Sequence, residues 1–171
     1  MAKGKKKPAS RVRKPAKKPA KAKPAKDGAD ASTQHFERGV NFAATGFLFD
    51  AIGCFRKSAE ADAKNALADD AYYNAGLCYF QLGLYHEAAE YFTRVIQGYP
   101  RATIHAAAGA KEFGKTAAKA HLGRLRAYLA LGRKDDAQKE IDDLNKYPDS
   151  YVVDGKGARR TFYELGLEAL K

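Results

Sequence analysis

The chain has 171 residues, of which 45% are hydrophobic and 11% aromatic, so most of it should fold around one core. It contains no apolar run long enough to span a membrane and no signal-peptide core near its start, which favours the cytoplasm as its compartment. Two cysteines, Cys54 and Cys78, are too few for a disulfide framework and lack zinc-site spacing, so both should be core residues.

The formal net charge of +11 is concentrated in an N-terminal tail, residues 1–34. Residues 1–26 hold 12 Lys and Arg and no acid, and four of the six prolines lie there. Because like charges repel and proline disfavours helix, this tail is predicted to be disordered. It should tether the chain to nucleic acid or another polyanion by counterion release, or else serve only as a solubilising tail. The contacting charges would include Lys5, Lys6, Lys7, Arg11, Arg13, Lys14, Lys17 and Lys18.

The remainder of the chain repeats a pattern of small and aromatic residues, and residues 72–100 hold its clearest copy. Small residues at Gly76 and Ala88 let two antiparallel helices approach, Gly83 can end the first helix, and Pro100 stops the second. The spacing resembles the tetratricopeptide repeat, which implies stacked helix pairs that bind other proteins without catalysis. The matching positions are Tyr72-x2-Ala75-Gly76-x2-Tyr79, then Ala88-x3-Phe92, then Pro100.

Weaker copies begin at His35 and His121, and a single first helix from Phe162 would cap the stack. The predicted fold is therefore all-α, a short right-handed solenoid over residues 35–171. Its repeats should span about residues 35–66, 69–100 and 118–149, with an insertion at about 101–117 and a capping helix at about 158–170.

Residues 109–116, GAKEFGKT, match the phosphate-binding loop G-x-x-x-x-G-K-[ST] letter for letter. That loop needs a buried parallel strand before it, and the preceding RATIHAAA lacks the required run of Val and Ile. The nearest candidate for a metal-binding acid would be Asp154, in a weak apolar run. We interpret the match as a loop or helix start, with nucleotide binding and a non-catalytic phosphate site near Lys115 as alternatives.

Other reactive patterns are weak. His86-Glu87-x-x-Glu90 lacks the second histidine of a zinc protease motif, and the acids of residues 135–143 fit a solvated helix face that could also hold a basic tail. The serines do not lie in nucleophile motifs. We therefore expect no enzymatic activity, no metal and no cofactor.

In a stack of this kind, the first helices of the repeats line the concave side. The apolar excess there predicts a groove for an extended peptide or an amphipathic helix of another protein, unless the insertion or self-association covers it. Relatives that clamp a C-terminal carboxylate use Lys and Asn at places held here by Phe36, Val40 and Tyr73, so that clamp is not expected. A resemblance to bacterial type III secretion chaperones is the alternative. The predicted lining is Phe36, Val40, Tyr73, Leu77, Phe80, Gln81, Leu122 and Arg126.

Overall fold

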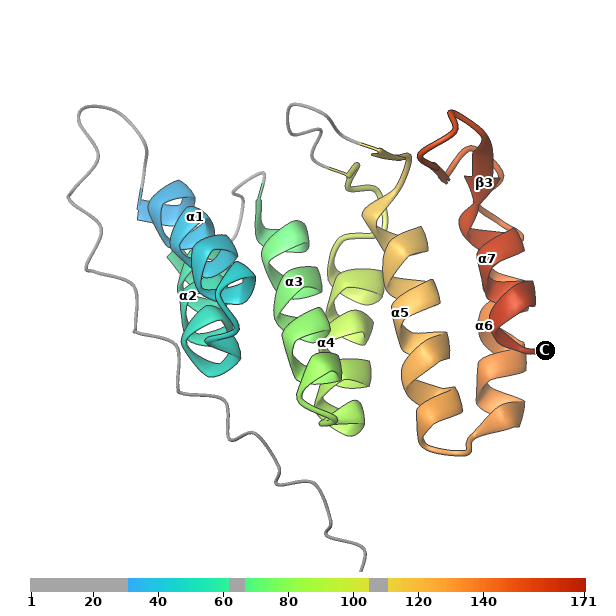
Figure 1. Ribbon diagram of the computed structural model, residues 1–171, viewed down its shortest axis with the longest axis horizontal. Helices are drawn as coiled ribbons and strands as arrows, with labels where there is room; N and C mark the ends of the chain where they lie inside the picture. Colours follow the sequence, from blue (N-terminus) through green and yellow to red (C-terminus); the bar gives the residue numbers. More distant parts are fainter. Residues whose placement is uncertain (1–30, 62–66, 105–110) are drawn as a thin grey trace, which may run out of the picture.

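In the computed structural model the described residues are 31–61, 67–104 and 111–171, and they form three antiparallel helical hairpins followed by one further helix (Figure 1). The tail prediction for residues 1–30 lies outside the described residues. Each helix packs against the next along the chain. The helices are α1 (Ala31–Ala44), α2 (Leu48–Ala61), α3 (Ala68–Gln81), α4 (Tyr85–Gly98), α5 (Thr116–Ala130), α6 (Lys134–Leu144) and α7 (Phe162–Ala169).

The three hairpin turns share one backbone feature, a glycine with positive φ soon after the first helix. These glycines are Gly46, Gly83 and Gly132, with φ of 82°, 77° and 73°. Only glycine adopts this left-handed conformation without a steric penalty, so each first helix ends at its predicted turn.

No helix within the described residues is long and apolar enough to cross a membrane.

Phe92 fills the contact between the second and third hairpins and is fully buried. A Cβ atom added at Gly76 would lie 2.8 Å from its ring, and one added at Gly123 would lie 2.7 Å away. Gly39 and Phe55 repeat this arrangement in the first hairpin, with a corresponding distance of 2.7 Å. Gly39 and Gly76 therefore allow helices to approach over an aromatic ring, as the sequence pattern predicted. The contact of Gly123 with Phe92 was not predicted.

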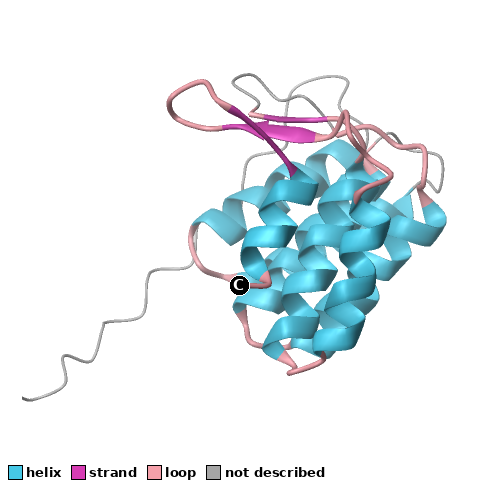
Figure 2. Ribbon diagram, turned by 90° about the vertical axis from the view of Figure 1, so that its right-hand side faces the viewer, coloured by secondary structure: helices cyan, strands magenta, loops and turns pink. Residues whose placement is uncertain are grey.

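A small antiparallel sheet lies across one end of the helices (Figure 2) and was not predicted. Its strands are β1 (Glu112–Phe113), β2 (Tyr151–Val153) and β3 (Arg159–Thr161), in the order β1-β2-β3. The sheet joins the insertion to the segment that precedes α7.

The element bounds differ from the predicted ones at both ends of the helical domain. Helix α1 begins at Ala31, so the predicted border between residues 34 and 35 falls inside it. Helix α7 begins at Phe162 instead of near residue 158, because β3 occupies residues 159–161. A capping box starts α7: the Thr161 side chain accepts a hydrogen bond from the Glu164 amide, and the Glu164 carboxylate accepts one from the Thr161 amide.

Candidate protein-binding surface

Three of the predicted groove residues, Tyr73, Leu77 and Phe80, lie in a row on α3, and we call them the α3 row. Their spacing of four and three residues places them on one face of the helix. All three are half-buried and pack against a cluster that includes Phe92. The Tyr73 and Phe92 ring centroids lie 5.6 Å apart, and those of Phe80 and Tyr85 lie 5.2 Å apart. The α3 row therefore serves the core while keeping part of its surface exposed.

Helix α5 adds cationic side chains next to the α3 row. Arg126 is exposed, and Lys119 lies seven residues before it, two turns earlier on the same face. The Lys119 Nζ lies 4.4 Å from the Tyr73 ring centroid and 2.7 Å from the Glu112 Oε2. It also lies 3.9 Å from the Asp70 Oδ1. Lys119 thus joins α3, β1 and α5, although its own side chain is only 8% exposed.

This arrangement covers one end of the α3 row. Burial raises the pKa of Tyr73 well above its ordinary value, the carboxylate of Glu112 raises it further, and the positive charge of Arg126 opposes the shift. The Tyr73 phenol is therefore neutral at physiological pH. Glu112 belongs to the predicted insertion, which therefore reaches Tyr73 through its ion pair with Lys119.

The other predicted lining residues divide between core and surface. Leu122 is 5% exposed and belongs to the core cluster with Leu125, so it does not line a groove. Phe36 packs edge-on against Phe55, with ring centroids 5.6 Å apart. Val40 is 45% exposed, and Gln81 is exposed at the end of α3.

Sequence reasoning selected Leu122 and Arg126 as the α5 residues that face the groove and missed Lys119. Helical spacing could have found it, since residues seven apart share a face and Arg126 was already predicted to line the surface. The structure places Lys119 over the ring of Tyr73, and the charge of Arg126 acts on the same tyrosine.

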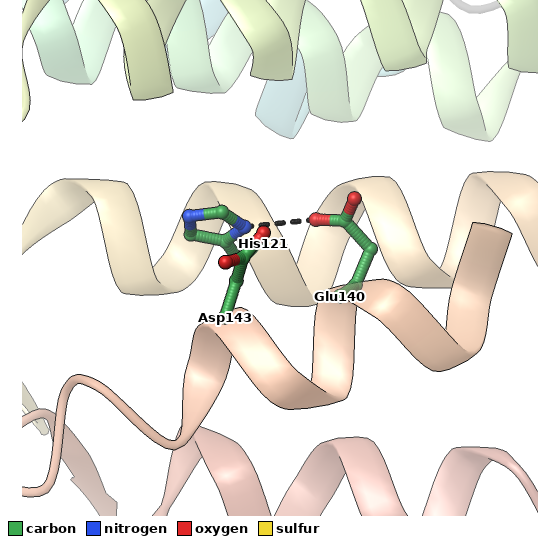
Figure 3. Close-up of side chains that lie close together, drawn as sticks. All are labelled: His121, Glu140 and Asp143. Carbon is green, nitrogen blue, oxygen red and sulfur yellow. Dashed lines mark hydrogen bonds and ion pairs between the residues drawn. The ribbon is translucent and has the colours of Figure 1, made fainter.

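A second polar cluster, buried between α5 and α6, contains His121, Glu140 and Asp143 (Figure 3). Their potential metal-ligand atoms lie within 4.8 Å of one another. However, the His121 Nδ1 already lies 2.8 Å from the Glu140 Oε2, and the Arg124 Nη2 lies 2.9 Å from the Glu140 Oε1. A guanidinium this close disfavours a second cation, so the cluster fits an ion-pair network that holds α5 against α6.

The structure gives the described part of GAKEFGKT, residues 111–116, a different role from phosphate binding. Gly114 has a φ of 105°, and a Cβ there would lie 2.6 Å from the Ser150 Cβ. The Lys115 amide donates to the Ser150 Oγ (3.0 Å), and the Lys115 Nζ donates to the Arg101 carbonyl (2.9 Å). The Thr116 amide donates to the Ala102 carbonyl. Groups that would hold phosphate in a nucleotide loop are thus used inside this fold; Gly109 and Ala110 lie outside the described residues.

Comparison with known proteins supports the helical pattern. A family model described as the tetratricopeptide repeat matches residues 69–97, which hold most of α3 and α4. No curated protein sequence matches the chain.

Several solved structures share the fold. The TPR domain of Arabidopsis OM64 is 16% identical, with a TM-score of 0.59 over 82% of this chain and 94% of that one. The second TPR domain of human RPAP3, solved with the HSP70 peptide SGPTIEEVD, is 20% identical, with the same TM-score and coverage. The second TPR of Spaghetti (RPAP3), bound to the HSP90 peptide SRMEEVD, is 23% identical, with a TM-score of 0.51 over 66% of this chain and 88% of that one. These similarities establish the tetratricopeptide fold.

Proposed function

We propose that this chain, which has one matched tetratricopeptide repeat and the tetratricopeptide fold, is a non-catalytic scaffold for another protein. The binding surface would be the α3 row together with Gln81 and Arg126. The observation that carries the proposal is the half-burial of the α3 row, which supplies fixed apolar contact area beside an exposed cation.

The chemistry of this surface suggests what the bound segment looks like. Exposed apolar parts of Leu77 and Phe80 suit an apolar anchor from an extended peptide or an amphipathic helix. Arg126 suits an acidic side chain next to that anchor. A carboxylate at Lys119 would first have to displace Glu112, which lies 2.7 Å from the Lys119 Nζ. We therefore propose that apolar contact dominates, with Arg126 supplying charge recognition.

The test uses the full-length chain with a photo-crosslinking amino acid at Gln81, an exposed position beside the α3 row. Crosslinked proteins would be identified by mass spectrometry. Arg126→Glu should reduce the crosslinked product several-fold, because it places a negative charge where an acidic side chain is expected. Lys134→Glu, an exposed charge reversal on α6, is the matched control and should leave the product unchanged. Equal crosslinking in the two variants would contradict the proposed surface.

The N-terminal tail is proposed as a second contact, to a polyanion. Its support is the sequence alone: 12 basic residues and no acid within residues 1–26. Each neutralised phosphate adds about 0.7 to the salt slope of binding to single strands and about 0.9 for duplex DNA. Changing the eight residues Lys5, Lys6, Lys7, Arg11, Arg13, Lys14, Lys17 and Lys18 to Gln should therefore flatten the salt dependence of DNA binding strongly. An unchanged slope would show that the tail makes no such contact.

A further inference from the structure

The two faces of the small sheet carry different side chains. In the antiparallel register, Phe113 lies opposite Tyr151, and Arg159 lies opposite Val153. Because side chains alternate along a strand, Phe113, Tyr151 and Arg159 share one face, which we call the outer sheet face. Glu112 and Arg160 lie on the opposite face.

The face with Glu112 and Arg160 is occupied by contacts to the helices. Glu112 pairs with Lys119 of α5 at 2.7 Å, and the Arg160 Nη2 lies 2.6 Å from the Glu168 Oε1 of α7. The sheet lies across the end of the helices (Figure 2). Because these two ion pairs reach α5 and α7, the outer sheet face is the one turned away from the helices.

The outer sheet face is a stack of two aromatic rings and a cation. The Phe113 and Tyr151 rings are stacked, with centroids 5.2 Å apart and planes inclined by 25°. The Arg159 guanidinium lies 4.6 Å from the Tyr151 centroid. Phe113 keeps 38% of its surface exposed, and Arg159 is also exposed. An exposed aromatic ring with a fixed orientation can accept another flat ring by stacking.

The charge around this stack is predominantly positive. Exposed Lys111 precedes β1, and exposed Lys156 lies in the turn between β2 and β3. Within residues 31–61, 67–104 and 111–171, neither these lysines nor Arg159 forms an ion pair. The nearby acid Asp154 is engaged, because its Oδ1 accepts hydrogen bonds from the Lys156 and Ala158 amides.

We propose that the outer sheet face binds single-stranded nucleic acid. A base would stack on the Phe113 ring, which is itself stacked on Tyr151. Arg159 and Lys111 would contact the neighbouring phosphates. Aromatic side chains on sheet surfaces can stack unpaired bases, and cations beside such rings contact the phosphate backbone whatever the sequence. The site is independent of the α3 row, and the cationic tail would add phosphate contacts that do not involve bases.

The test must separate stacking from simple charge attraction. Full-length protein is titrated at fixed salt into two fluorescent 12-mers, oligothymidylate and an abasic strand with the same phosphates. The wild type should bind oligothymidylate about five-fold or more tightly than the abasic strand, because each stacked base contributes at least that factor. Phe113→Ala should remove this preference while leaving abasic binding unchanged, since the tail and lysines remain.

Phe49→Ala is the matched control, because Phe49 is an exposed phenylalanine on α2, 68% accessible. It should keep the full preference, as should Phe113→Tyr, which retains the ring. If Phe113→Ala alters the circular-dichroism spectrum, Arg159→Gln decides the question and should weaken binding of both strands with a smaller salt slope.

The proposal is overturned by a wild type without preference for bases, by an equal loss in Phe49→Ala and Phe113→Ala, or by an Arg159→Gln variant that binds as the wild type does. Equally strong competition by a polyglutamate 12-mer would also overturn it, because that result identifies an acidic peptide as the occupant.

Discussion

The α3–α4 hairpin and the three-stranded sheet are stabilised by different kinds of contact. In the hairpin, Gly76 and Phe92 meet across one turn, and the partners lie close together in the sequence. In the sheet, Glu112 pairs with Val152, about 40 residues away, and each strand has only two or three residues. Hairpin stability thus comes from burial, whereas the sheet depends on a few specific contacts.

The polar contacts of the sheet make this difference concrete. The Ser150 side chain is buried, and its Oγ accepts a hydrogen bond from the Lys115 amide. Gly114 packs directly against Ser150. Short strands supply few ladder hydrogen bonds, so such contacts carry a larger share of local stability. We therefore expect core substitutions in the hairpin to lower the free energy of unfolding of all the helices together. Substitutions near Gly114 should destabilise only the sheet and its surroundings.

The largest effect should come from Phe92→Ala in the hairpin. The ring is fully buried between Gly76 and Gly123, so its removal leaves a cavity and should lower the free energy of unfolding by about 3–5 kcal/mol. Urea unfolding followed by circular dichroism measures the change. Phe49→Ala, at a residue 68% exposed, is the control and should change stability little. Similar losses in both variants would mean that Phe92 does not hold the hairpins together.

A smaller effect is expected from Gly123→Ala, which adds one methyl group to the same contact. Its Cβ would lie 2.7 Å from the Phe92 ring, and the overlap should destabilise the chain by about 1–3 kcal/mol. At Gly53 in α2, an added Cβ meets nothing within 4 Å. Gly53→Ala should therefore stabilise by about 0.5–1 kcal/mol, because alanine favours helix. If the two variants change the free energy of unfolding in opposite directions in the same urea assay, the close approach of Gly123 to Phe92 is supported. Changes in the same direction contradict it.

The helical hairpins could be predicted because their determinants are local. One repeat contains Gly76, Gly83 and Phe92. Their spacing indicates which helices are in contact and where the turn lies. The sheet could not be predicted in this way, because its strands are too short to show alternation. Its pairing of Phe113 with Tyr151 joins segments that carry no common pattern.

The positions of the proposed lining residues could be predicted only where helix geometry alone determines them. Tyr73 and Leu77 follow from the face of α3. The position of Leu122 could not be predicted in this way, because α5 packs against helices on both sides and its apolar residues lie in the core. The match of GAKEFGKT to a phosphate loop shows the same limit: Gly114 is explained by its contact with Ser150, which is distant in the sequence.

Gly114→Ala tests the sheet side of the comparison. The backbone there has a φ of 105°, and the added Cβ would overlap Ser150, so local strain of about 1–3 kcal/mol is expected. Hydrogen exchange should quicken at the amides of Ile104 and Val153, which donate to the Gly114 and Lys111 carbonyls. Exchange in α3 and α4 should stay unchanged. Equal acceleration in both regions would show that the sheet and the hairpin unfold together.

The smallest expected effect comes from Asp154 in the turn between β2 and β3. The amides of Ala158 and Lys156 donate to its carboxylate and hold the pKa of Asp154 below its usual range. A lowered pKa means that the carboxylate stabilises the turn above the ordinary aspartate value near 4 and loses this effect as the pH falls through the folded-state pKa. Amide chemical shifts of Lys156 and Ala158 should therefore titrate together, with a midpoint below that ordinary value.

Asp154→Ala should abolish that titration and loosen only the turn, because the charge is solvent-exposed and its hydrogen bonds stay within a few residues. Exchange at the Lys156 and Ala158 amides should then be fast at neutral pH. The amide of Phe162 at the start of α7, which donates to the Ser150 carbonyl, should keep its protection. A midpoint at or above the ordinary aspartate pKa, or loss of protection at Phe162, would mean that the carboxylate does not act through these two amides alone.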